Sequence, residues 1–255
     1  MTKRLTIAAA IASTLMATSV LADNLTGMGT FGYQRHRGDV DIFSFGGDLN
    51  YSLDNSLNLQ LSGGDRHLDT TGVSGDLTTL KGDAFFRNSD GVLGASVAQH
   101  WLSAGASFGG FSATASSDVQ SYGAFAEWYG SEAFTLQLKG GGFSGATDGG
   151  YFGVGGKFYV LPDLSLNADY SYVKPNATSN VNQINVGTEY LPFAGTPLTV
   201  GAAYTYLEGS GAVSNAIGFT LKYRFGASSG SSLANWDRSG PQQWTGQLPI
   251  LGDLH

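Results

Sequence analysis

Hydrophobic and polar residues alternate along most of the chain between Thr26 and Phe225. The segment 42–53 is a clear case, because one set of alternate positions is apolar and the other set is polar (Phe43, Phe45, Leu49 and Tyr51 against Ser44, Asp48, Asn50 and Ser52). Side chains two residues apart lie on the same face of an extended strand. The alternation therefore predicts strands that each have one apolar face and one polar face.

The recurrence of this pattern predicts twelve strands. Their predicted ranges are 26–36, 40–53, 56–67, 77–87, 92–102, 118–129, 133–144, 149–160, 164–174, 182–191, 197–207 and 214–225. These lengths cluster near the roughly 9–11 residues that a tilted strand needs to cross a bilayer.

The connections between the predicted strands alternate in length. Tight, turn-prone links at 54–56, 88–91, 130–132 and 161–163 alternate with links that include the longer segments 68–76, 103–117 and 175–181. Outer-membrane barrels have short periplasmic turns and longer external loops. We therefore expect both ends of the strand series to lie on the periplasmic side, with the link 192–197 longer than this rule prefers.

Composition separates a membrane barrel from a soluble β-protein. Charged residues make up 13% of the chain, about half of the usual share in globular proteins. Gly, Ser, Thr and Asn dominate the polar face, whereas a soluble exterior would carry denser Lys and Glu. A barrel of about twelve strands is also too wide to be filled by apolar side chains alone.

These observations favour an all-β fold, a closed antiparallel transmembrane β-barrel of about twelve strands. Its apolar face would contact lipid, and its polar face would line the interior. Because lipid offers no hydrogen-bond partners, the sheet must close on itself. A soluble secreted β-sandwich or lipocalin-like barrel and a fibrous β-array are the rival architectures.

The first residues have the pattern of a secretory signal peptide. Lys3 and Arg4 precede an apolar stretch that ends at Ala22 with a small-residue cleavage pattern. The alternative, a membrane anchor, needs roughly 20 strongly apolar residues, and this stretch is rich in Ala, Ser and Thr. The predicted organisation is a signal peptide at 1–22, a barrel at 23–226 and a C-terminal tail at 227–255. Cleavage would change the formal net charge from −7 to −9.

Strand parity places charged side chains on the polar face. Seven are basic and five are acidic: Arg66, Lys81, Arg87, Lys139, Lys157, Lys222 and Arg224 with Asp48, Asp83, Glu127, Asp169 and Glu189. Charges that line a barrel set its ionic selectivity, so a basic surplus predicts a weak preference for anions. The alternative is that these groups pair across a narrow lumen and close it.

Residues 218–225, within the last predicted strand, resemble the terminal strand signal of bacterial outer-membrane proteins. In that signal a Gly precedes alternating hydrophobic and aromatic residues and a final Phe, here represented by Gly218, Leu221, Tyr223 and Phe225. The strand spacing as a whole resembles porin-like proteins. The resemblance implies a Gram-negative outer-membrane location, contact with outer-membrane lipid and recognition by the outer-membrane assembly machinery. In the family Phe is usually the last residue, whereas residues 226–255 follow it here.

The tail begins with a Gly/Ser-rich segment at 227–232, which is the composition of a flexible linker. The remainder carries Trp236 and Trp244. Three alternatives stay open for it: a flexible periplasmic segment, a plug in the lumen, or a docking segment for a periplasmic partner.

The chemistry of the chain points away from catalysis. It has no Cys and only four His, and these show no transition-metal spacing. Ser and Asp are so common that a chance pairing with His67 is expected, so no catalytic, metal or cofactor-binding residue is predicted. No nucleic-acid partner is expected, and the oligomeric state is not determined. The expected function is passive diffusion of small polar or anionic solutes through a porin-like channel. The alternative is a structural or surface-interaction barrel that acts through its loops or tail.

Overall fold

The computed structural model describes residues 24–53, 56–108, 111–176, 178–193, 196–209, 212–226 and 232–243. The predicted signal peptide lies outside this part of the chain. The described residues form twelve strands and one short helix: β1 Leu25–His36, β2 Val40–Ser52, β3 Leu57–Thr70, β4 Val73–Arg87, β5 Gly91–Phe108, β6 Phe111–Ser131, β7 Phe134–Gly145, β8 Gly149–Leu161, β9 Leu164–Pro175, β10 Val181–Tyr190, β11 Leu198–Gly209, β12 Ala212–Phe225 and α2 Leu233–Ser239.

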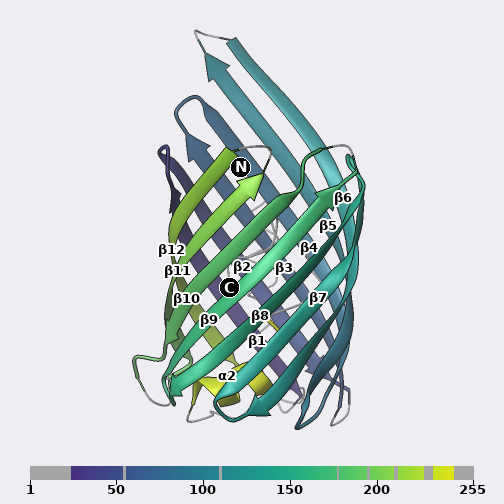
Figure 1. The fold of residues 1–255 in the computed structure, drawn as a ribbon, viewed down its shortest axis with the longest axis vertical. Coiled ribbons are helices and arrows are strands. Elements are labelled where there is room, and N and C mark those ends of the chain that lie inside the picture. The colour runs from purple at the N-terminus through teal and green to yellow at the C-terminus, as the bar shows by residue number, and fades with distance from the viewer. Residues whose placement is uncertain are drawn as a thin grey trace.

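The twelve strands form one closed antiparallel barrel in which each strand pairs with its neighbours in sequence (Figure 1). The ring closes between β1 and β12, from Gly27 opposite Phe225 to His36 opposite Ala216. Closure gives backbone partners to both sides of every strand, which a sheet in lipid requires. The predicted fold class and strand number are confirmed.

The two faces of the wall differ as the alternation predicts. Leu59, Leu138, Leu166 and Leu221 are between 41% and 50% exposed on the outside, although they are large and apolar. Their strand neighbours on the other face are buried polar residues, among them Gln60 and Ser165. The barrel therefore has an apolar exterior and a polar interior, the reverse of a soluble β-barrel.

Two of the expected long loops are strand instead. β5 and β6 are 18 and 21 residues long, and they pair as far as Phe108 opposite Phe111, so the segment 103–117 is mostly sheet (Figure 1). β3 and β4 likewise pair up to Thr70 and Val73. The small and polar residues of these extensions weaken the apolar alternation, while the cross-strand backbone bonds persist.

The rule of short inner turns and long outer loops is therefore wrong for these connections. The segment 191–197 between β10 and β11 is longer than the two-residue links 71–72 and 109–110. β6 pairs with β7 only from Val119 onward. Its first part pairs with β5 alone and forms a hairpin that projects past the rest of the rim.

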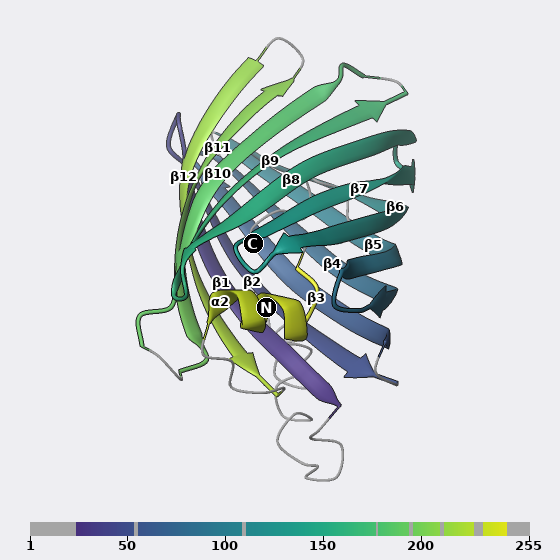
Figure 2. The same cartoon turned by 60° about the horizontal axis from the view of Figure 1, so that its bottom comes forward.

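The chain turns back into the barrel after β12. Gly226 has a φ of +80°, and a Cβ there would lie 2.1 Å from the carbonyl oxygen of Leu25, so only glycine fits this turn. α2 follows, and the Ser232 hydroxyl accepts a hydrogen bond from the Asn235 amide at its N-terminus. Figure 2 shows α2 inside the end of the barrel at which β1 begins and β12 ends. No helix in the described part of the chain has the length and apolar character needed to cross a membrane.

Candidate functional site

We call residues 232–243 the plug, and the end of the barrel that they occupy the plug end. The apolar side of the plug consists of Leu233 and Trp236, which are fully and almost fully buried. They pack against Tyr159 and Leu191 of the barrel wall. The Leu233 amide also donates a hydrogen bond of 2.7 Å to the Pro162 carbonyl, in the turn between β8 and β9.

The plug is also bonded to strands on several sides of the lumen. Gln242 and Gln60 of β3 form a reciprocal pair, in which the Gln242 amide donates at 2.7 Å and the Gln60 side chain donates back at 2.9 Å. The Arg238 guanidinium donates to the Phe134 carbonyl at 3.1 Å and lies 4.6 Å from the centre of the Tyr129 ring. These contacts bridge the lumen from β3 to β7, so the plug spans the opening.

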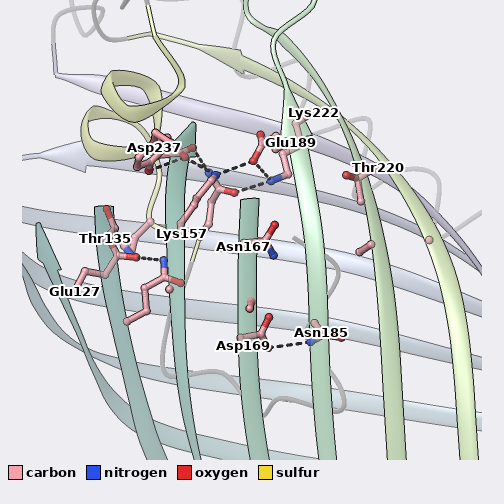
Figure 3. A pocket seen from close by; sticks show the side chains of 18 of the residues that line it. Glu127, Thr135, Lys157, Asn167, Asp169, Asn185, Glu189, Thr220, Lys222 and Asp237 are labelled. Carbon is pink, nitrogen blue, oxygen red and sulfur yellow. Dashed lines mark hydrogen bonds and ion pairs between the residues drawn. The ribbon is translucent and has the colours of Figure 1, made fainter. Parts of the chain in front are cut away.

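A cluster of five charged side chains joins the plug to the wall, and Figure 3 shows four of them, Lys157, Glu189, Lys222 and Asp237. Glu189 of β10 is at its centre. Its carboxylate accepts from Lys157 Nζ at 2.8 Å, Lys222 Nζ at 3.2 Å and Arg224 Nη2 at 2.7 Å. Asp237 of α2 pairs with Lys157 and, at 2.9 Å, with Arg224. The cluster thus holds three cations against two carboxylates, in a region with little access to water.

The members of the cluster come from inward-facing positions of different strands. β8, β10 and β12 are separate strands, yet their polar positions all project inward toward the plug end. Thr199 of β11 completes the arrangement, since its hydroxyl donates to Glu189 at 2.9 Å and accepts from Arg224 at 2.8 Å. Loss of one member of a buried ion-pair cluster leaves its partners uncompensated, which is costly.

The interior keeps a cavity of about 100 Å³, bordered on one side by the plug. Amide and hydroxyl side chains supply most of its polar wall: Gln34, Thr135, Gln137, Asn167, Asn185, Thr205 and Thr220, with Gln242 and Gln243 from the plug. Such a wall provides hydrogen-bond donors and acceptors to water or to a polar solute.

The twelve charges predicted for the polar face all lie at inward strand positions. Lys157, Glu189, Lys222 and Arg224 meet in the cluster. Lys81 and Asp83 form a second buried pair at 3.2 Å. The others are spread along the lumen: Glu127 beside Gln137, Asp169 beside Asn185, Arg87 beside Gln242, and Arg66, Asp48 and Lys139 at inward positions of β3, β2 and β7. The cluster at the plug end also borders the cavity, because Lys157, Glu189 and Lys222 are among its lining residues.

Sequence reasoning missed the members of the site that come from the tail. Asp237, Arg238 and Gln242 carry no strand parity, and a helix of seven residues shows almost no periodic signal. Tyr159 was not among the predicted lumen-lining residues. Within the described residues, no group of three or more His, Asp or Glu side chains could hold a metal ion.

The four residues of the terminal strand signal divide between the faces of β12. Leu221 and Tyr223 point outward and are exposed. Gly218 lies on the inner face, where a Cβ would come within 2.8 Å of the Gln34 side chain. The Phe225 ring lies over Gly27 of β1, at 2.0 Å from where a Cβ would be, so it covers the closing seam.

Comparisons with known proteins relate the chain to others by fold. No protein-family model and no curated protein matches the sequence. Among solved structures, the KdgM porin aligns with a TM-score of 0.56 at 10% identity, over 77% of this chain and 98% of that one. An outer-membrane channel from Pseudomonas putida F1 aligns with a TM-score of 0.54 at 11% identity, over 81% and 97%.

A third similar structure, the β domain of the Bordetella autotransporter BrkA, has a TM-score of 0.50 at 12% identity, over 80% of this chain and 99% of that one. At these identities the likeness concerns the fold alone. In this chain that fold is a closed ring of twelve antiparallel strands with an apolar exterior and a polar, charged interior. The chain has the fold of the porin-like outer-membrane β-barrels.

Proposed function

We propose that the protein is a channel for small polar or anionic solutes in the outer membrane of a Gram-negative bacterium, after removal of residues 1–22. The observation that carries the proposal is the lumen lined by polar side chains, with a cavity of about 100 Å³ against the plug, within a barrel whose outer face is apolar. A barrel that served only to anchor its loops would not need polar side chains around an internal cavity. The likeness to solved porins and channels supports the same function.

The proposed orientation places the plug end in the periplasm. An even number of strands brings the start of β1 and the end of β12 to the same end of the barrel, and in outer-membrane barrels this end is periplasmic. The plug would then be the last part of the channel that a solute passes on its way inward. The projecting β5–β6 hairpin would lie outside the cell.

The charges of the lumen support a weak preference for anions. The five-charge cluster has one more cation than anion, and Lys139 lies on the inner face of β7 nearer to mid-barrel. Fixed positive charge lowers the barrier for anions and raises it for cations, by an electrostatic effect that salt weakens.

Ion conductance in planar bilayers tests the proposal. We expect discrete current steps that grow when residues 227–255 are removed, and a reversal potential across a salt gradient on the anion-selective side. Changing Lys139 and Lys157 together to Gln should reduce this selectivity, and changing both to Glu should reduce it further. Heat-dependent migration in SDS gels would show that each variant still forms a barrel.

The alternative is a barrel that does not transport. The ion pairs between the plug and the wall favour it, because they close one end of the lumen in the structure. Absence of current from folded protein, with and without residues 227–255, would overturn the channel and leave a structural or surface-interaction role.

A further inference from the structure

We propose that the lumen contains a carboxylate-binding site, and that the plug occupies it as an internal competitor for anionic solutes. The site consists of Lys157, Tyr159 and Arg224, and the competitor is the side chain of Asp237. This inference rests on the proposed channel function and names the class of solute: small organic acids that carry a carboxylate and polar substituents.

The geometry around Asp237 is that of a bound carboxylate. One oxygen, Oδ2, accepts from Lys157 Nζ and, at 3.0 Å, from the Tyr159 hydroxyl. The other, Oδ1, accepts from Arg224 Nη2 at 2.9 Å. All three donors belong to the barrel wall, so they form a receptor for any carboxylate in that position. Hydrogen bonds between ionised partners are the strong ones.

The receptor is held in place by the wall itself. Glu189 binds Lys157 and Arg224, and Thr199 binds Arg224 on its other nitrogen. These contacts do not involve the plug, so the donors keep their positions when α2 leaves. A preorganised site does not have to be ordered again when a ligand binds, which favours affinity.

The charge balance of the cluster requires an anion. Without Asp237, the three cations Lys157, Lys222 and Arg224 would face the single carboxylate of Glu189. Lys222 and Arg224 are almost fully buried, and an uncompensated buried charge is unfavourable. An anionic solute supplies the second negative charge that Asp237 provides in the closed state, whereas a neutral solute does not.

The plug is attached in a way that allows it to leave. α2 has only seven residues, too short to be stable as a helix on its own. Its remaining polar contacts to the wall each have at most one charged partner: the pair between Gln242 and Gln60 is neutral, and Arg238 and Arg87 each bond a neutral acceptor. The space beside Asp237 is lined by Asn167, Asn185 and Thr220, which can bond the hydroxyl groups of a polar acid.

Calorimetric titration of the full-length protein in detergent, with gluconate and glucose as a charged and an uncharged probe, tests the site. We expect gluconate to bind Asp237→Asn at least tenfold more tightly than the unchanged protein, because Asn cannot neutralise the cluster. Glucose should bind neither. Asp90→Asn, the same change in an exposed turn at the plug end, should bind gluconate like the unchanged protein.

Thiol labelling supplies a second, independent measurement. The chain has no cysteine, so Leu233→Cys would introduce a single buried thiol that reacts only when the plug moves. Gluconate should raise its labelling rate and glucose should not. Ala234→Cys is a partly buried alternative if the first variant does not fold.

The two proposals can fail separately. Equal affinity of gluconate for Asp237→Asn and the unchanged protein, or a labelling rate that gluconate does not change, would overturn the competitor. If these variants still conduct ions, the channel function stands. If none of them conducts while gluconate behaves as expected, the carboxylate site stands and transport fails.

Discussion

At the scale of single residues, glycines in the wall differ in the space that a side chain would find. Gly141 lies on the inner face of β7, where a Cβ would be 2.1 Å from the Tyr122 carbonyl oxygen and 2.6 Å from the Tyr151 hydroxyl. Gly82 has the opposite parity on β4, and a Cβ there would meet nothing within 4 Å. Crowding by neighbouring backbone therefore explains one of these glycines and not the other.

We predict that Gly141→Ala destabilises the barrel by about 1–3 kcal/mol, because the methyl group must displace backbone. Gly82→Ala should change stability much less. The free energy of unfolding in urea, measured in lipid vesicles, compares the two. Similar losses for both variants would contradict the packing described here.

The facing of the strands gives a second prediction. Leu138→Arg should cost on the order of 2–4 kcal/mol if Leu138 lies near the middle of the membrane. Gln137→Arg should be tolerated better, since the Gln137 amide already donates to Glu127 in the lumen at 2.7 Å. Folding yield into vesicles and urea stability would show the difference, and equal sensitivity would mean that the faces are assigned wrongly.

At the scale of elements, the strands were predictable and the tail was not. A strand such as β9, predicted at 164–174 and found at Leu164–Pro175, has large apolar and small polar residues in strict alternation. The outer parts of β5 and β6 lack this contrast, so hydrophobicity alone could not extend them. The docking of the plug depends on contacts with β3, β8 and β12, which local sequence does not encode.

The plug helix gives a prediction at this scale. Trp236→Ala removes a large buried side chain, a loss of about 3–5 kcal/mol in typical cores, and should therefore favour the open state. We expect a larger single-channel conductance with unchanged heat resistance of the barrel. Trp128→Ala, which alters an outward-facing side chain that is 57% exposed, should leave the conductance unchanged. Equal conductance of Trp236→Ala and the unchanged protein would argue against a gating role of α2.

At the scale of the whole molecule, closure of the sheet determines behaviour in detergent. The ring from β1 to β12 leaves almost no free strand edge within the barrel wall, and such edges are where unfolding and aggregation begin. We predict that the purified protein needs detergent, remains folded in SDS at room temperature and unfolds on heating. A shift in gel migration with temperature would show this, whereas recovery as a soluble periplasmic protein would contradict it.

The interior could be predicted only in part from the sequence. Parity identified the charged positions, because each strand repeats with a period of two. It could not show which of them meet, since Lys157, Glu189 and Arg224 are brought together by the curvature of a closed ring. Nor could it show that the tail contributes the second carboxylate.

The position of Asp237 also implies an order of events during biogenesis. Its partners lie on β8 and β12, and the other contacts of the plug begin at β3, so the complete set exists only after the first and last strands have met. A segment that binds the finished barrel and not the unfolded chain draws the folding equilibrium toward the finished form. The plug would thus dock last and stabilise the closed ring.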